Sequence, residues 1–118
     1  MKKIEPVELA KFIYEKRKEY FDNLEYYLKI IKQRVKELLP DAKVYLFGSV
    51  VTGDYHPALS DIDIAIVSEN IPEKAIERAR IRIKLLEDLD YHPFEIHLLT
   101  PKEWEFYKNF VKDNYKEI

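Results

Sequence analysis

The sequence predicts a small domain of the α+β class, in which helices pack against a mixed β-sheet and a long helical segment occupies the N-terminus. Two patterns lead to this fold class. Apolar residues between positions 6 and 39 recur at spacings of three and four, as in amphipathic helices. Between positions 43 and 99, three short apolar segments are separated by a loop and a helical stretch. The chain has 118 residues, so we expect a single domain over residues 1–118.

The N-terminal helical segment covers residues 1–40. Its main apolar stripe consists of Phe21, Leu24, Leu28, Ile31, Val35 and Leu38. Pro40 ends the pattern, because proline lacks the N–H that a helix interior requires. A separate apolar cluster at positions 7–14 leaves open whether the segment is one helix or two, and the pattern does not show where a break would fall.

Three strands are expected in the sheet region, residues 43–99. The first, at 43–47, is short and apolar, and the third lies at 94–99. The second, at 61–67, alternates Asp and Ile before it becomes wholly apolar. The loop at 48–60 joins the first two strands. If those two pair antiparallel, and the helical connection makes the second and third parallel, all three form one mixed sheet.

Two further helices complete the predicted fold. One follows the second strand, with Pro72 as its first helical residue. Its inward stripe is expected to consist of Ile76, Ala79, Ile83 and Leu86. The other occupies residues 100–118 at the C-terminus. It opens with a capping box, in which Thr100 and Glu103 bond each other's backbone N–H groups.

The composition excludes several classes of protein. With no cysteine, the chain has no disulfide, catalytic thiolate or zinc–thiolate site. No apolar run approaches the ~20 residues of a membrane span, and the first residues lack the pattern of a secretory signal, so we expect a cytoplasmic protein. A net charge of −2 does not indicate direct nucleic-acid binding. Residues 41–70 hold one basic and five acidic residues, which favours a site for cations.

Both glycines lie in one short window directly after the first strand. They are Gly48 and Gly53, although average usage would give about eight glycines in a chain of this length. This concentration indicates a local need for positive φ, or for close approach of the backbone to a ligand. Their spacing is that of a P-loop, but Asp54 and Tyr55 stand where that motif requires Lys followed by Ser or Thr. A P-loop is therefore excluded.

Two acidic residues open the second strand. Asp61 and Asp63 are two positions apart, so they share one face of the strand at a separation of about 7 Å. Carboxylates at this spacing can hold hard cations such as Mg²⁺, although solvated Asp residues are also common where a strand begins. The expected pairing brings Glu95, near the start of the third strand, to the same sheet edge. Three carboxylates gathered there repel one another unless cations bind.

These residues carry a resemblance to a known family. Residues 46–49 (Leu-Phe-Gly-Ser) and 60–64 (Ser-Asp-Ile-Asp-Ile), with Gly53 between them, resemble the Gly-Ser…Asp-x-Asp signature of the DNA polymerase β-like nucleotidyltransferase superfamily. The size is similar to that of its minimal nucleotidyltransferase branch. Members of that branch often pair with HEPN-domain proteins in prokaryotic toxin–antitoxin modules.

The resemblance implies a Mg²⁺-dependent transfer of a nucleoside monophosphate, AMP from ATP, to an acceptor hydroxyl, with release of pyrophosphate. The nucleotide-binding residues that it implies are Gly48, Ser49, Gly53 and Ser60. The catalytic and metal-binding residues that it implies are Asp61, Asp63 and Glu95, which would hold two Mg²⁺ ions. Glu95 would also accept the proton of the attacking hydroxyl.

A second function, of a different class, stays open beside the enzyme. The chain would then be a binding module that covers a HEPN-like partner or a second copy of itself, with little or no catalysis. Thr52 favours this alternative, because related minimal proteins often have Arg or Lys just before the second glycine, whereas the intact acidic residues favour the enzyme. His97 lies two residues after Glu95 and shares its face; we interpret it as a half-buried sheet histidine, with an approach to the site as the alternative.

Overall fold

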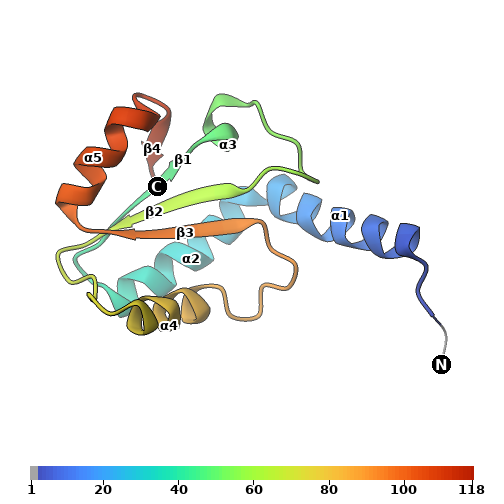
Figure 1. The fold of residues 1–118 in the computed structure, drawn as a ribbon, viewed down its shortest axis with the longest axis horizontal. Coiled ribbons are helices and arrows are strands. Elements are labelled where there is room, and N and C mark those ends of the chain that lie inside the picture. The colour runs from blue at the N-terminus through green and yellow to red at the C-terminus, as the bar shows by residue number, and fades with distance from the viewer. Residues whose placement is uncertain (1–2) are drawn as a thin grey trace.

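A computed structural model describes residues 3–118, in which five helices and four strands are formed (Figure 1). In chain order they are α1 (Pro6–Asp22), α2 (Leu24–Leu38), β1 (Lys43–Phe47), α3 (Ser49–Thr52), β2 (Ile62–Val67), α4 (Ala75–Leu85), β3 (Phe94–Leu99), α5 (Pro101–Val111) and β4 (Tyr115–Glu117). The predicted α+β class is confirmed. Among the described residues, no helix is long and apolar enough to cross a membrane.

The four strands form one mixed sheet in the order β3-β2-β1-β4. Strand β1 pairs antiparallel with both β2 and β4, and β2 pairs parallel with β3 through the crossover that contains α4. The antiparallel and parallel pairings predicted for the first three strands are therefore confirmed. Their register aligns Phe47 with Asp63 and Asp63 with Glu95, so these three positions form one row across the sheet.

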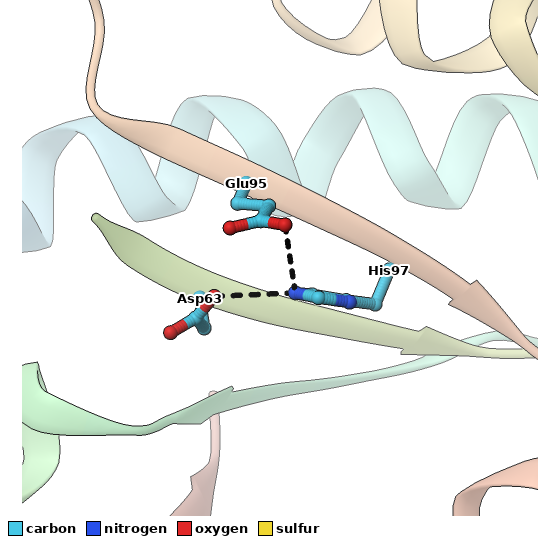
Figure 2. A group of neighbouring side chains, drawn as sticks. All are labelled: Asp63, Glu95 and His97. Carbon is cyan, nitrogen blue, oxygen red and sulfur yellow. Dashed lines mark hydrogen bonds and ion pairs between the residues drawn. The ribbon is translucent and has the colours of Figure 1, made fainter.

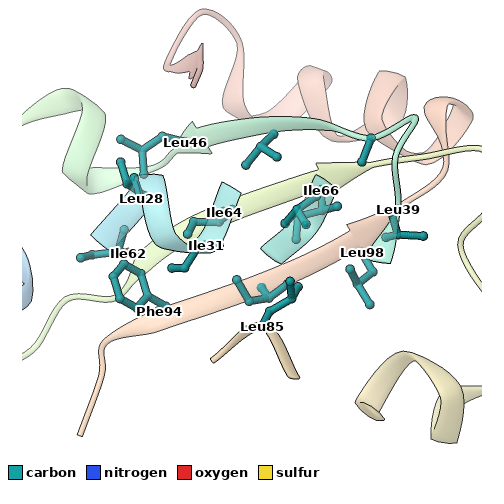
Figure 3. Close-up of a cluster of buried hydrophobic side chains, with 14 of the residues drawn as sticks. Leu28, Ile31, Leu39, Leu46, Ile62, Ile64, Ile66, Leu85, Phe94 and Leu98 are labelled. Carbon is teal, nitrogen blue, oxygen red and sulfur yellow. The ribbon is translucent and has the colours of Figure 1, made fainter. Parts of the chain in front are cut away.

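One face of the sheet carries the main hydrophobic core (Figure 3). Alternate strand residues point to this face because side chains alternate along a strand. Those from β1, β2 and β3 are Val44, Leu46, Ile62, Ile64, Ile66, Phe94, Ile96 and Leu98. Helix α2 covers them with Leu28, Ile31 and Val35, and α4 contributes Leu85. The apolar stripe predicted for residues 21–38 therefore packs in the core, as its spacing indicates, except at its last member, Leu38, which is 36% exposed.

The opposite face of the sheet is covered in part by α5. Its Trp104 packs with Phe47, Ala65, Val67 and Leu99 in a second, smaller cluster. The helix begins at the predicted capping box, in which Thr100 and Glu103 bond each other's backbone N–H groups at 3.1–3.2 Å. The remaining end of this face carries polar side chains in place of a second core.

The long N-terminal segment breaks at Asn23, which the apolar pattern did not locate. Asn23 has φ −119° and ψ 36°, outside the helical region, and its Nδ2 donates to the carbonyl oxygen of Glu19 at 3.0 Å. A short amide side chain competes in this way with the helical hydrogen bonds of its own backbone. The segment therefore consists of two helices, α1 and α2.

Helix α4 differs from its prediction in both its start and its buried side. It begins at Ala75, three residues later than the expected Pro72. Ile76 and Ile83, expected to point inward, are 60% and 69% exposed, whereas Leu85 is fully buried. The predicted inward stripe is thus wrong for two of its four members.

Arginine side chains explain why α4 buries a different side from the one predicted. Arg78 Nε donates to the carbonyl oxygen of Pro72 at 2.6 Å, and Arg82 Nε donates to that of Ile96 in β3 at 3.0 Å. Both arginines are half-buried. Because an arginine can lay its apolar stem along the core while its guanidinium bonds to backbone, these residues take inward positions that a count of apolar side chains assigns elsewhere.

The C-terminal residues are not a continuous helix, so the prediction for residues 100–118 is wrong beyond Val111. Lys112 has φ +52°, which ends the helix and reverses the chain. Strand β4 then adds to the free edge of β1. Just before it, the carbonyl oxygen of Asn114 accepts the N–H of Gly48 at 3.3 Å, so the end of the chain also holds the first glycine in place.

A carboxylate links the two loops at the far end of the sheet. Asp41 accepts the hydroxyl of Ser68 at 2.7 Å and the backbone N–H of Glu69 at 2.9 Å. The hydrogen bond from Ser68 is the largest of the causes that lower the pKa of Asp41 below its usual value. These bonds favour the ionised form, so the carboxylate stabilises the folded state only while it is charged.

We expect Asp41→Asn to lower the melting temperature at pH 7, because an amide cannot accept both hydrogen bonds. A folded-state pKa below the unfolded value of 3.8 contributes stability above pH 3.8, and that contribution is lost as the pH falls through the folded pKa. The difference from wild type should therefore shrink below pH 4. Thermal melts at pH 7 and pH 3 measure it, with the exposed Glu73→Gln as the control. An equal difference at both pH values would contradict the role of the charge.

Candidate functional site

The candidate site lies at one end of the α5 face, where the row of Phe47, Asp63 and Glu95 crosses three strands. Odd-numbered residues of β2 and β3 point to this face, opposite the main core. Asp63 is near the start of β2 and Glu95 near the start of β3, and parallel pairing sets them side by side (Figure 2). Their side chains are 24% and 55% exposed, so solvent reaches both carboxylates.

His97 lies between the two carboxylates. Its Nε2 is 3.2 Å from Oδ1 of Asp63 and 3.9 Å from Oε1 of Glu95, and Figure 2 shows both contacts. One ligand atom from each of the three residues lies within 4.8 Å of the others. His97 is a half-buried histidine of β3, as interpreted from the sequence, and it also approaches the site residues, which was the alternative. The signal was present, because Glu95 and His97 are two positions apart on one strand.

Aromatic side chains fix the orientation of the His97 ring. The ring centroid lies 5.1 Å from that of Phe47 on β1 and 5.8 Å from that of Tyr107 on α5. The side chain is 20% exposed. Helix α5 thus contributes to the site indirectly, by holding the imidazole against the two carboxylates.

Gly48 lies directly beneath Asp63. It has φ +83° and ψ −154°, a region that only glycine occupies readily. A Cβ placed on Gly48 would lie 2.7 Å from Oδ2 of Asp63, closer than non-bonded atoms can approach. The positive φ expected at this glycine is therefore confirmed, and the group that lies close to its backbone in this structure is the Asp63 carboxylate.

Three other sequence-predicted residues organise the loop behind Gly48. Ser49 is the first residue of the four-residue helix α3. Gly53 ends that helix with φ +86°, and its N–H donates to the carbonyl oxygen of Ser49 at 2.9 Å. The hydroxyl oxygen of Ser60 accepts the backbone N–H of His56 at 2.9 Å, which closes the loop before β2.

Asp61 is placed differently from the other two acidic residues. Strand β2 begins at Ile62, so Asp61 precedes the sheet. Its Oδ1 lies 3.7 Å from Nη2 of Arg17 on α1, and its side chain is 54% exposed. The structure therefore brings together Asp63 and Glu95, with His97 as the third member, whereas Asp61 faces a basic residue that the sequence analysis did not associate with the site.

The chemistry of this donor set fits a divalent cation. Two carboxylates supply the oxygen ligands that Mg²⁺ prefers, and the imidazole of His97 can supply a nitrogen. Asp63, Glu95 and His97 lie close enough together for one ion to contact all three. Asp61 lies at the edge of this group and would have to turn from Arg17 to join it.

The sequence matches the model of the nucleotidyltransferase domain family over residues 28–118, so the chain belongs to that family. Its predicted place in the polymerase β-like nucleotidyltransferase superfamily is confirmed. Two solved structures named "putative nucleotidyltransferase" have similar folds. One is 42% identical, covers 77% of this chain and 96% of its own, and has a TM-score of 0.64. The other, from Sulfolobus solfataricus, is 25% identical, covers 86% of this chain and 85% of its own, and has a TM-score of 0.56.

No curated protein matches the sequence. Helix α1 precedes the residues that the family model matches.

We expect Gly48→Ala to destabilise the fold more than Gly53→Ala. Both changes place a side chain at positive φ, which costs about 1–3 kcal/mol. Only at Gly48 does the new methyl group also meet the Asp63 carboxylate, since nothing lies within 4 Å of the corresponding atom at Gly53. Urea unfolding of the two variants and wild type measures the difference.

The variants also separate backbone strain from damage to the site. Gly53→Ala should keep the divalent-cation affinity of the wild type, and Gly48→Ala should lose it, because its methyl group displaces Asp63. Equal stability of the two variants, or unchanged cation affinity in Gly48→Ala, would contradict the close packing of Gly48 against Asp63.

Proposed function

We propose that this protein is a cation-dependent nucleotidyltransferase that moves a nucleoside monophosphate, AMP from ATP, to an acceptor hydroxyl. Membership in the nucleotidyltransferase family supports the reaction class. The observation that carries the proposal is the pairing of Asp63 with Glu95 on adjacent parallel strands, directly above Gly48. A site of this kind combines oxygen ligands for a cation with a segment of backbone that a phosphate can approach.

In this proposal each residue has a defined task. Asp63 and Glu95, with Asp61 after it turns from Arg17, would hold Mg²⁺, which offsets the charge of the phosphates when it is bound. Glu95, the more exposed of the paired carboxylates, accepts the proton of the acceptor hydroxyl. Gly48 has no side chain to displace Asp63, so its backbone stays close to that carboxylate. Ser49 donates its hydroxyl to the phosphates, and Gly53 and Ser60 shape the loop.

The open side of the site supports an acceptor that is itself large. Helix α5 covers only part of its face of the sheet, and the Glu95 side chain is 55% exposed. An acceptor hydroxyl carried by a partner protein could reach Glu95 there without entering a cavity. We therefore propose that the acceptor is presented on the surface of a macromolecule.

The test is a calorimetric titration of ATP with and without Mg²⁺, followed by incubation with α-labelled ATP and candidate acceptors. We expect ATP to bind only in the presence of Mg²⁺, because the carboxylates repel the triphosphate until a cation binds. Asp63→Asn should abolish both cation-dependent binding and transfer. ATP binding of equal strength with and without Mg²⁺, or none in either case, would contradict the proposal.

The nitrogen in the donor set leads to a prediction on metal preference. We expect His97→Asn to weaken Co²⁺ binding about tenfold and to change Mg²⁺ binding much less, because Co²⁺ accepts imidazole nitrogen more readily than Mg²⁺ does. Calorimetric titration and the visible absorption of bound Co²⁺ measure the effect. His56→Asn, in the exposed loop, is the matched control. Equal losses for both cations in His97→Asn, or no loss, would show that His97 is not a ligand.

A binding module is the second candidate, and exposed apolar side chains favour it. Val7 and Phe12 on α1 are 79% and 44% exposed, and Phe106 and Phe110 on α5 are 61% and 72% exposed. Surfaces of this kind are common where another chain binds. A HEPN-like partner or a second copy of this chain would cover them, and a complex that forms without any transfer from labelled ATP would favour this candidate over the enzyme.

A further inference from the structure

Helix α1 reaches the loop of the candidate site, although it lies outside the part of the chain that the family model matches. The loop runs from Asp54 to Asp61 and connects α3 with β2. It holds two residues that the sequence analysis assigned to the site, Ser60 and Asp61.

Arg17 makes the central contact between α1 and the loop. Its Nε donates to the carbonyl oxygen of Pro57 at 2.9 Å, and its Nη2 donates to the carbonyl oxygen of Ser60. The Arg17 side chain is only 16% exposed. One guanidinium thus binds the backbone on both sides of the tip of the loop, and its planar fork gives those two carbonyls a fixed separation.

Two aromatic contacts flank Arg17 along the same helix. Phe21 stacks on Tyr55 with ring centroids 5.0 Å apart and an interplanar angle of 10°, and Tyr14 lies 6.2 Å from His56. Arg17 lies between Tyr14 and Phe21 in the sequence, at helical spacings of three and four, so the three side chains form one stripe. This stripe of α1 therefore follows the loop over much of its length.

The part of α1 that carries Arg17 is itself anchored. Tyr20 is 5% exposed, and its hydroxyl donates to the carbonyl oxygen of Asp90 at 2.8 Å. Burial raises the pKa of Tyr20 to about 12, so the hydroxyl stays protonated and keeps donating. Arg17 therefore projects from a part of α1 that is fixed to the core. Its hydrogen bonds restrict the motion of the loop relative to the core.

We propose that Arg17 is a positioning residue for the candidate site, in which it holds the backbone of residues 57–60 so that Asp61 needs only a turn of its side chain to join Asp63. The proposal rests on the proposed function for the identity of the site. Arg17 makes no ion pair with Asp63 or Glu95; it acts through the loop. Without it the loop would have to be ordered each time that the cation and ATP bind, which weakens binding.

The contact with Asp61 does not make Arg17 a competitor of the cation. The 3.7 Å separation is too long for a hydrogen bond, and the Asp61 side chain is 54% exposed. An ion pair at this distance, with a carboxylate that is mostly in solvent, contributes little. The hydrogen bonds from Arg17 to the two backbone carbonyls are shorter than its contact with Asp61. Asp61 can therefore turn to a cation while these hydrogen bonds stay formed.

The test compares Arg17→Ala and Arg17→Lys with a matched control, Arg34→Ala. Arg34 also donates to two backbone carbonyls, those of Leu85 at 3.1 Å and Glu87 at 2.8 Å, but at the end of α4. Two quantities are measured below the lowest melting temperature of the set. One is the affinity for ATP in excess Mg²⁺, and the other is amide hydrogen exchange over residues 54–61.

We expect Arg17→Ala to bind ATP with Mg²⁺ about tenfold more weakly and to exchange the loop amides faster, whereas Arg34→Ala changes neither quantity. Lysine keeps the charge but not the fork, so Arg17→Lys should restore only part of the affinity. Full rescue by lysine would overturn the proposal in favour of a purely electrostatic role.

Other results would also overturn it. Unchanged loop exchange in Arg17→Ala would show that Arg17 does not hold the loop, and faster exchange with unchanged affinity would show that the loop does not position the site. Tighter binding in Arg17→Ala would show that Arg17 withholds Asp61 from the cation. If wild type itself binds no ATP, the proposed function fails, and the exchange measurement still decides whether Arg17 orders the loop.

Discussion

The parallel pairing of β2 with β3 is the constraint on which the rest of the site depends. It sets Asp63 beside Glu95, two carboxylates that lie far apart in the sequence. His97 lies between them, with its Nε2 3.2 Å from Oδ1 of Asp63. The crossover through α4 makes this pairing possible, because parallel strands cannot be joined by a tight turn. Antiparallel pairing with β1 then brings Gly48 against the Asp63 carboxylate.

The two faces of the sheet divide stability from chemistry. Helices α2 and α4 bury one face almost completely, so the strands are fixed from that side. The other face can therefore expose polar groups to solvent. Helix α5 covers part of this face, where its side chains pack against Phe47 and His97. Charged groups at the exposed end are tolerated because the register is already determined by the apolar side chains on the opposite face.

The sequence was sufficient for the sheet and for part of the site. Strands β1 and β3 have the predicted bounds, since apolar segments between turn residues define them, and the pairing of Asp63 with Glu95 follows from topology. The contact of Arg17 with the loop could not be predicted, because it joins positions about forty residues apart through backbone carbonyls that carry no sequence signal. Strand β4 was missed for a related reason: three residues, Tyr115–Glu117, have too little pattern to be recognised before their partner strand is known.

The location of a bound cation tests this account most directly. Mn²⁺ added below stoichiometry to the ¹⁵N-labelled protein broadens the amide signals of residues near its site. We expect the broadening to centre on Gly48, Asp63 and Glu95 and to spare Lys43 and Glu69, which line the cavity of about 340 Å³ at the other end of the sheet. Broadening centred on Lys43 and Glu69, or spread evenly over the acidic surface, would contradict a cation site at the edge where Asp63 meets Glu95.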